Sequence, residues 1–188
     1  MTMTAQTAQV KCFNDPPQPV TAVLAVSIRC FRPTPLTSLS VAFVGSVLLT
    51  AGRASVRLEI LRALAIALGL AELMAQVMKH LANQSRPLAV LDGLNTHGYP
   101  VEPLGNAYPS AHTAWFVGVA CALWPWVRWP QRIVGVAIAV LVACNRIYIG
   151  AHWPIDVVGG AAIGMFAGAC TWLIATRWPI RSHATQTA

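Results

Sequence analysis

The sequence predicts an all-α fold, an integral membrane bundle of five or six transmembrane helices. The first observation is composition. The 188 residues are 56% hydrophobic and only 10% charged, whereas an average soluble domain carries roughly 25% charged residues. The second observation is a series of apolar segments close to the roughly 20 residues that a membrane-spanning helix needs. Their approximate bounds are 36–52, 61–78, 113–127, 133–149 and 155–176.

The N-terminal region is predicted to be a polar tail followed by one short apolar stretch. Residues 1–19 are rich in Thr and Gln and lack the charged start, apolar core and cleavage site of a secretory signal peptide. Residues 20–28 are apolar but are followed by Arg29 and Arg32. We favour a helix that lies on the membrane surface or is partly inserted, and the alternative is a sixth, irregular span.

The connections between the apolar segments differ in length. "RASVRLE" and "RWPQR" are expected to be short connections, whereas about 33 residues separate the second and third segments, from Lys79 to His112. This stretch is rich in Pro, Gly and Asn. Long irregular loops in compact proteins are often functional.

The last segment contains "GGAAIGMFAG", in which Gly160, Gly164 and Gly168 recur every four residues. Such a face of small residues lets two helices approach closely. We favour packing within one protomer over dimerisation, and the oligomeric state stays open.

The distribution of basic residues predicts the orientation in the membrane. Cytoplasmic span ends carry an excess of Lys and Arg. Seven arginines share one set of span ends: Arg53, Arg57, Arg62, Arg128, Arg132, Arg177 and Arg181. That set is predicted to be cytoplasmic, so the long connection and the 146–156 turn face away from the cytoplasm. The chain then divides into 1–35, the tail with its interfacial or partly inserted helix; 36–178, the membrane domain; and 179–188, a short cytoplasmic tail.

Charge and cysteine content exclude several classes of partner. The net charge is +7, but the basic residues are scattered, without the Lys/Arg run of a nucleic-acid-binding tail. The five cysteines form no CxxC pair, and three lie within apolar segments, which favours packing over disulfides or metal binding. We therefore expect the membrane as the partner and no nucleic acid.

Three polar clusters fall on one side of the predicted membrane, each at a span end. They are "KHLANQSRP", "YPSAHT" and "NRIYIGAHWPID". Lys79, Arg86 and Arg146 bring three permanent cations, which suit phosphate oxygens and would repel a divalent metal ion. There are no paired carboxylates and no HExxH, so no metal site is predicted.

The remaining polar residues of these clusters suit a reaction on the anion. Ser110 precedes a helix expected to begin near Thr113, where its hydroxyl and the helix N–H groups would point at the anion. Asp156 lies four residues after His152, and with a helix beginning near residues 153–154 it reaches one ring nitrogen and leaves the other free to attack. His112 is then free to donate a proton to a leaving oxygen.

These clusters resemble the three-part signature of the type 2 phosphatidic acid phosphatase / vanadium haloperoxidase superfamily. That signature is Lys-x6-Arg-Pro, then Pro-Ser-Gly-His, then Ser-Arg-x5-His-x3-Asp, and all three parts occur here in order with matching spacing. The chain departs from it at Ala111, which replaces the glycine, and at Asn145, which replaces the serine before Arg146. Ala111 still offers a backbone N–H, and Asn145 can still hydrogen-bond.

The resemblance implies a role for each matched residue. His152 attacks phosphorus to form a phosphohistidine, Asp156 orients it, and His112 protonates the leaving group. For a phosphatase of this kind the resemblance implies no metal or other cofactor. The phosphate-binding residues implied are Lys79, Arg86, Ser110, Ala111 and Arg146.

The resemblance and the apolar segments together imply a lipid phosphatase of a bacterial inner membrane, with its active site on the extracytoplasmic side. Its expected substrate is a lipid phosphate or diphosphate, of the undecaprenyl diphosphate or phospholipid type. The alternatives are a non-catalytic protein that binds or transports lipid phosphates, and a phosphatase of small soluble esters.

Glu72 lies inside the second apolar segment, where a charge is costly and usually functional or paired. It precedes Lys79 by seven residues and so shares its helix face, with Gln76 on a neighbouring part of that face. Support of the phosphate site and purely structural pairing are equally favoured for Glu72. His80 and His97 match no motif position and are interpreted as structural.

Six tryptophans near span ends suit the membrane interface. They are Trp124, Trp126, Trp129, Trp153, Trp172 and Trp178.

Overall fold

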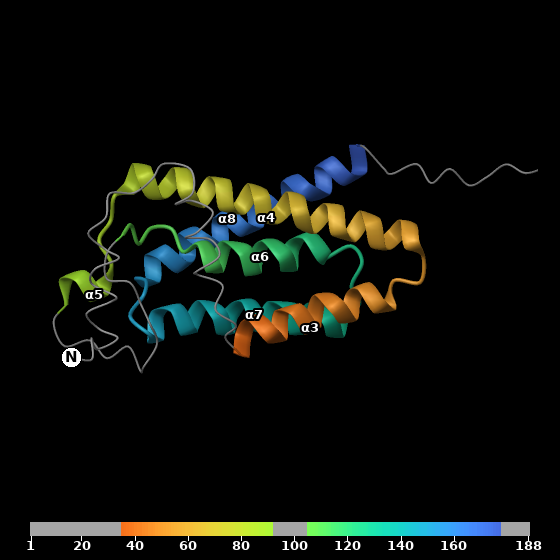
Figure 1. The fold of residues 1–188 in the computed structure, drawn as a ribbon, viewed down its shortest axis with the longest axis horizontal. Helices are drawn as coiled ribbons and strands as arrows, with labels where there is room; N and C mark the ends of the chain where they lie inside the picture. Colours follow the sequence, from red (N-terminus) through yellow and green to blue (C-terminus); the bar gives the residue numbers. More distant parts are fainter. Residues whose placement is uncertain (1–34, 92–104, 178–188) are drawn as a thin grey trace, which may run out of the picture. The chain divides into compact units, whose positions relative to one another are not determined.

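The computed structural model describes residues 35–91 and 105–177 (Figure 1). The chain divides into two compact units, 1–38 and 39–188. The described helices lie in the second unit, except for residues 35–38 at the start of the first of these helices, which belong to the first unit. Four predictions concern residues outside the described ranges: the surface helix at 20–28, His97, Trp178 and the tail at 179–188.

The described residues form helices and no strand, so the all-α prediction is confirmed. The helices are α3 (Pro35–Thr50), α4 (Ala54–Ala82), α5 (Pro87–Val90), α6 (Ala111–Leu123), α7 (Trp129–Tyr148) and α8 (Pro154–Arg177).

All five predicted apolar segments are helical, but the helices differ in length. Within residues 35–91 and 105–177, three helical stretches are long and apolar enough to cross a membrane: Ala54–Val90, Trp129–Tyr148 and Pro154–Ala175. The helices α3 and α6 are shorter. With 13 residues, α6 extends only about 20 Å, less than the roughly 30 Å of a bilayer core.

Several predicted boundaries are wrong. "RASVRLE" is not a connection, because its residues from Ala54 onward form the first turns of α4, and Arg53 is the N-cap. The helix also runs on to Ala82, so Lys79 lies in its last turn rather than in a loop. The third helix begins at Ala111 rather than near Thr113, because Ser110 caps it.

Helix α6 lies at the centre of the bundle and contacts α4, α7 and α8, and α4 also contacts α8. The C-terminal ends of α4 and α7 meet the N-terminal ends of α6 and α8 at the left of Figure 1, beside α5. We call this end, which carries Lys79, Ser110 and His152, the motif end. The other end, which carries Arg53, Arg128 and Arg177, is the opposite end.

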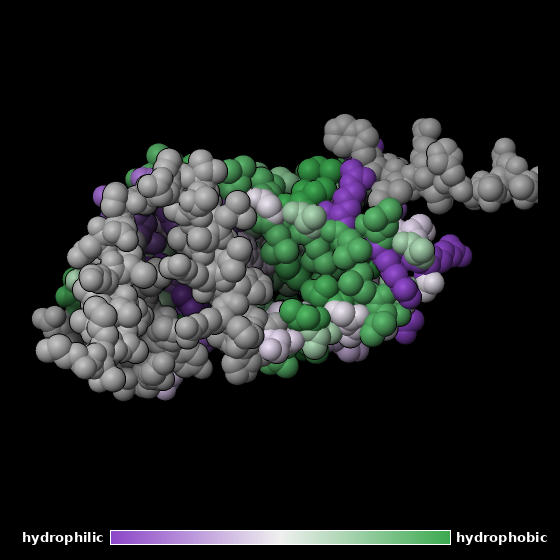
Figure 2. Space-filling view, viewed as in Figure 1, coloured by the Kyte–Doolittle hydropathy of each residue, from purple (hydrophilic) through white to green (hydrophobic). Residues whose placement is uncertain are grey.

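The interior of the bundle is built mainly from small side chains, and many large ones face outward. Ala67, Ala71 and Ala75 of α4 are fully buried, and Ala71 packs with Ala114 of α6 and Ala167 of α8. The exposed side chains include Leu68, Leu73, Met165 and Phe166. Figure 2 shows the resulting hydrophobic surface along the helices, with hydrophilic side chains gathered at the opposite end. An outer surface this apolar is that of an integral membrane protein.

The glycine face of α8 packs against α6 of the same chain. A Cβ at Gly160 would overlap the carbonyl oxygen of Ser110, and one at Gly164 would lie 2.5 Å from the carbonyl oxygen of Ala114. One at Gly168 would overlap the Cβ of Cys121. The preference for packing within one protomer is therefore confirmed for these glycines.

One cluster of large buried side chains lies toward the opposite end. Val47 of α3 packs there with Ile60 and Leu64 of α4, Leu123 of α6 and Val127. A second cluster, of Ala71, Ala114, Ile163 and Ala167, has Met74, Met78 and Trp115 packed against it.

Candidate active site

His152 lies in a tight turn between α7 and α8. Gly150 adopts φ 68°, a left-handed conformation that glycine adopts readily at the end of a helix. The carbonyl oxygen of Arg146 accepts hydrogen bonds from the backbone N–H groups of Ala151 and His152, both at 3.2 Å. The Arg-x5-His spacing is thus a turn that brings the imidazole back over the end of α7.

Asp156 connects this turn to the start of α8. Its Oδ2 accepts a hydrogen bond of 2.8 Å from the backbone N–H of Trp153, the residue before the helix. The same oxygen lies 3.5 Å from Nδ1 of His152, an ion-pair distance longer than an ordinary hydrogen bond. Both side chains are almost completely buried. Because Asp156 faces Nδ1, the nitrogen left for chemistry is Nε2.

The surroundings of His152 keep its imidazole neutral. Burial lowers the pKa of His152 to about 4, and the positive charges of Arg86 and Arg146 act in the same direction. Asp156 opposes the shift. A neutral ring has the lone pair that a nucleophile needs. Both arginines lie close enough to His152 for their charges to be felt there.

Ser110 joins the second motif to the third. Its backbone N–H donates a 2.9 Å hydrogen bond to the carbonyl oxygen of Asp156. Its hydroxyl oxygen accepts from the hydroxyl of Thr113 at 3.0 Å and from the backbone N–H of Thr113 at 3.5 Å. Since Ser110 Oγ accepts from Thr113, it keeps its own proton to donate.

The departure at Ala111 fits the local backbone. Ala111 is the first residue of α6, and it is not among the described residues with positive φ. A Cβ is therefore tolerated without strain. The other departure, Asn145, lies in the last turn of α7 with a half-buried side chain.

The first motif leads from α4 to the short helix α5. Lys79 is in the last turn of α4, and Asn83 ends that helix with φ 44°. Arg86 is the N-cap of α5, with Pro87 in its first turn. The side chains of Lys79 and Arg86 are half-buried at the motif end.

Three hydrogen bonds hold this segment against the other two motifs. Asn106 Nδ2 donates to the carbonyl oxygen of Lys79 at 2.7 Å. The backbone N–H of Ala107 donates to the carbonyl oxygen of Gln84 at 2.7 Å. Trp153 Nε1 donates to the carbonyl oxygen of Ser85 at 3.0 Å. The structure therefore brings all three predicted clusters to one place.

His112 is the second residue of α6 and is half-buried. Its ring lies 5.3 Å from that of Trp115, with a tilt of 45°. Trp115 Nε1 donates a 2.8 Å hydrogen bond to Oε2 of Glu72 on α4. Gln76 Nε2 donates to Oε1 of the same carboxylate at 2.6 Å. Glu72 is thus linked to His112 through one indole ring.

Sequence reasoning missed the supporting residues Asn106, Thr113 and Trp115, and assigned Trp153 only to the membrane interface. Thr113 could have been found from its spacing of three from Ser110, which is the spacing of a helix cap. The other three contact partners that lie 27 to 68 residues away in sequence. No local pattern predicts such pairs.

Comparison with known proteins gives one family. The profile of the PAP2 superfamily matches residues 60–179. The chain is 29% identical over 120 residues to the putative undecaprenyl-diphosphatase YbjG of Escherichia coli, covering 64% of this chain and 58% of that protein. It is 30% identical over 119 residues to an undecaprenyl-diphosphatase of Sulfolobus acidocaldarius, covering 63% and 56%. The chain thus spans somewhat more than half the length of these relatives.

The fold is similar to that of one solved structure. The crystal structure of LpxE from Aquifex aeolicus superposes with a TM-score of 0.59 at 24% identity, covering 88% of this chain and 93% of that one. At this level of identity the likeness concerns the fold.

Proposed function

The chain belongs to the PAP2 superfamily, and on that premise we propose that it is a metal-independent membrane phosphatase acting on a lipid phosphate or diphosphate. The observation that carries the proposal is the buried His152–Asp156 pair, which is hydrogen-bonded through its backbone to Ser110. This contact joins a neutral nucleophile to the N-terminus of α6, where an anion is stabilised by backbone N–H groups and the helix dipole.

The proposed reaction has two steps. Nε2 of His152 forms a bond to phosphorus while the P–O bond to the lipid breaks, and the leaving oxygen takes its electron pair and a proton from His112. Water then attacks phosphorus, the P–N bond breaks, and inorganic phosphate is released. In that step His112 takes the proton from water, which restores both histidines.

The permanent cations stabilise the charge that gathers on the phosphoryl oxygens. Lys79, Arg86 and Arg146 come from three different segments, so they can approach the phosphate from separate directions. The hydroxyl of Ser110 and the backbone N–H of Ala111 are the proposed neutral donors. Such preorganised donors supply most of the rate enhancement in phosphoryl transfer.

The outer surface supports a lipid substrate. The helices around the site expose Leu73, Val77 and Ile155, so the apolar tail of a lipid would remain in contact with the bilayer while its head group enters the site. Two relatives are named undecaprenyl-diphosphatases, and on that basis undecaprenyl diphosphate is the first substrate to test, with phospholipid phosphates second.

We place the site on the extracytoplasmic side of a bacterial inner membrane. Basic residues lie at the helix ends that form the opposite end of the bundle, as expected for a cytoplasmic face: Arg53 and Arg57 at the start of α4, Arg128 and Arg132 at the start of α7, and Arg177 at the end of α8. Residues 36–178 would then be the phosphatase domain, with 1–35 and 179–188 flanking it.

The test is phosphate release in detergent with EDTA present. The substrates are undecaprenyl diphosphate, phosphatidylglycerol phosphate, phosphatidate and a soluble phosphate ester, each with wild type and His152→Ala. We expect release from at least one lipid, inhibition by vanadate, and loss of release in His152→Ala. Full activity of His152→Ala would refute the mechanism. Hydrolysis of the soluble ester alone would refute the substrate class, and binding of lipid without hydrolysis would indicate a non-catalytic binding protein.

A further inference from the structure

An acidic side chain lies in the membrane-spanning part of the bundle, seven residues before Lys79 of the first motif. Glu72 is in the middle of α4, which runs from Ala54 to Ala82, and its side chain is half-buried. A carboxylate at such a depth is costly unless its oxygens are hydrogen-bonded. Here both are, to Gln76 on the same helix and to Trp115 on α6.

The hydrogen bond to Trp115 fixes the indole ring from one edge. The rest of the ring packs against the buried cluster that includes Ala71, Ala114 and Ile163. The indole ring lies 5.3 Å from the ring of His112, tilted by 45°. Trp115 is held by this hydrogen bond and by its packing against the buried cluster. The position of the ring beside His112 therefore depends on Glu72.

We propose that Glu72 and Trp115 are positioning residues for His112 as the proton donor to the leaving group. The inference depends on the proposed function, since it assigns a role within that reaction. An imidazole at the open end of a helix has several rotamers, and only one of them directs a nitrogen toward the leaving oxygen. A fixed aromatic ring beside it restricts these rotamers, and an indole ring at this distance also attracts a protonated imidazole. Misplacement of a catalytic group by about 1 Å can cost a factor of about 100.

A purely structural role would predict something different. If Glu72 only stabilised the pairing of α4 with α6, its loss would lower the amount of folded protein and affect every substrate equally. A positioning role acts on the proton donor alone. It is therefore felt only where the leaving group needs a proton, and the leaving group is the variable that separates the two roles.

The experiment compares two substrates with the same alkyl tail on the full-length protein in detergent. Dodecyl phosphate must expel an alcohol and needs a proton, whereas 4-dodecyl-2-nitrophenyl phosphate expels a stable phenolate and does not. The constant kcat/KM reports on cleavage of the P–O bond, before water attacks the phosphohistidine. For Glu72→Leu we expect a fall of about 30-fold on dodecyl phosphate and under threefold on the aryl ester. Glu72→Gln keeps an oxygen for the indole N–H and should remain within threefold of wild type on both.

Trp115→Phe is the second variant, for use if Glu72→Leu does not fold. It keeps a ring beside His112 but removes the N–H, and a fall of about fivefold on dodecyl phosphate alone is expected. Glu59→Leu is the matched control, because Glu59 lies thirteen residues earlier on α4 and about 20 Å from Glu72 along the helix. It should leave the ratio of the two rate constants unchanged.

Equal losses on both substrates in Glu72→Leu or Trp115→Phe would overturn the inference, and so would no loss on either. A wild type that cleaves neither substrate, or a His152→Ala variant that cleaves both, would instead refute the proposed function.

Discussion

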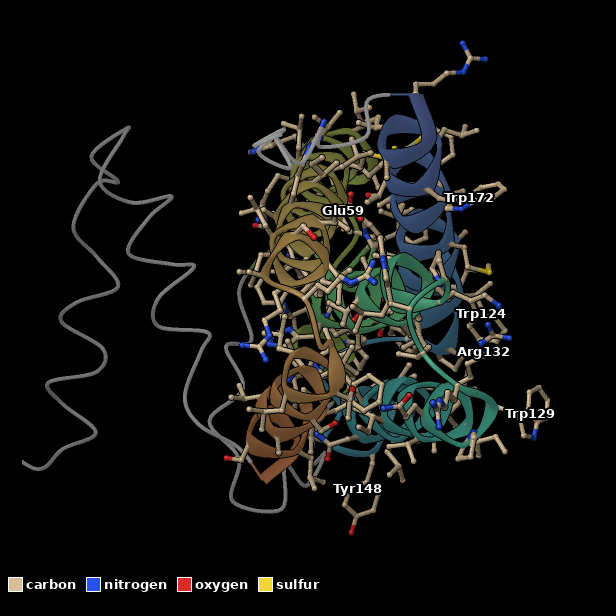
Figure 3. The ribbon with its side chains drawn as sticks, turned by 90° about the vertical axis from the view of Figure 1, so that its right-hand side faces the viewer. Glu59, Trp124, Trp129, Arg132, Tyr148 and Trp172 are labelled. Carbon is tan, nitrogen blue, oxygen red and sulfur yellow. The ribbon has the colours of Figure 1, made fainter. Side chains whose placement is uncertain are left out.

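The two ends of the helical bundle use similar residues in opposite ways. At the motif end, His152, Asp156 and Ser110 are buried, with Asp156 joined to Ser110 by a backbone hydrogen bond and to His152 through its side chain. At the opposite end, Trp129 is 68% exposed, and Arg132 lies over the ring of Trp124 at 4.8 Å (Figure 3). Both ends are rich in positive charge. The difference is that Arg86 and Arg146 act on a buried histidine at one end, whereas Arg128 at the other end is exposed.

The largest expected effect contrasts a residue from each end. His152→Ala should lower kcat on a lipid phosphate by at least about 1,000-fold, because it removes the nucleophile. Arg128→Ala, at the exposed N-cap of α7, should change kcat by less than threefold. Phosphate release from the purified variants measures both. A large loss in Arg128→Ala would show that the two ends do not divide function as described.

Acidification should destabilise the protein through the motif end. The pKa of His152 is about 4 in the folded protein against 6.5 for a free histidine. Above pH 6.5 neither state binds the proton, and between 6.5 and about 4 only the unfolded state does. Stability is therefore lost as the pH falls through this window, by up to about 3 kcal/mol. Melting followed by tryptophan fluorescence should show this loss in wild type.

Two variants test the assignment of this acid effect to His152. His152→Asn should lack most of it, because no imidazole is left to titrate. His80→Asn should keep it, since His80 is exposed in the last turn of α4. An unchanged acid profile in His152→Asn would assign the effect to another group.

Alanine substitutions of glycines in α8 test the difference between the two ends. Gly160→Ala would push the carbonyl oxygen of Ser110 and should cost about 2 kcal/mol together with most of the activity. Gly168→Ala meets the Cβ of Cys121, farther from the motif end. It should cost about 1 kcal/mol and leave the activity of the folded protein intact. Gly69→Ala is the control, with no atom within 4 Å of the new Cβ, and should be neutral. Thermal melting and specific activity measured together distinguish the three.

The smallest effect concerns the opposite end alone. Arg132 Nη2 also donates to the carbonyl oxygen of Trp124 at 3.1 Å. An exposed cation–π contact contributes roughly 0.5–1 kcal/mol. Arg132→Gln should therefore lower the melting temperature only slightly and leave kcat unchanged. A drop in stability comparable to that of Gly160→Ala would mean that the opposite end is as tightly organised as the motif end.

Much of this arrangement could be predicted from the sequence, for identifiable reasons. Apolar length located every long helix. The spacing from Arg146 to His152 to Asp156 predicted one turn and one helix start, because short spacings there are fixed by local geometry. The predicted starts of two helices were wrong. Helix α4 begins at Ala54, because helix-forming residues precede its apolar part, and α6 begins at Ala111, because Ser110 caps it. The contacts of Asn106 with Lys79 and of Trp153 with Ser85 depend on tertiary packing, which leaves no local signal.

The small residues inside the bundle have a consequence for how the chain can vary. In a soluble protein the large apolar side chains are inside, and the surface accepts most changes. Here Ala71 and Ala75 are fully buried, and a Cβ at Gly164 would overlap the backbone of α6. The large side chains of Leu73 and Phe166 are exposed instead. In a saturation mutagenesis scan, the positions that tolerate substitution should therefore be the reverse of those in a soluble protein. Exchange among large apolar residues would be silent on the outer face, and the addition of a single methyl group would be selected against within.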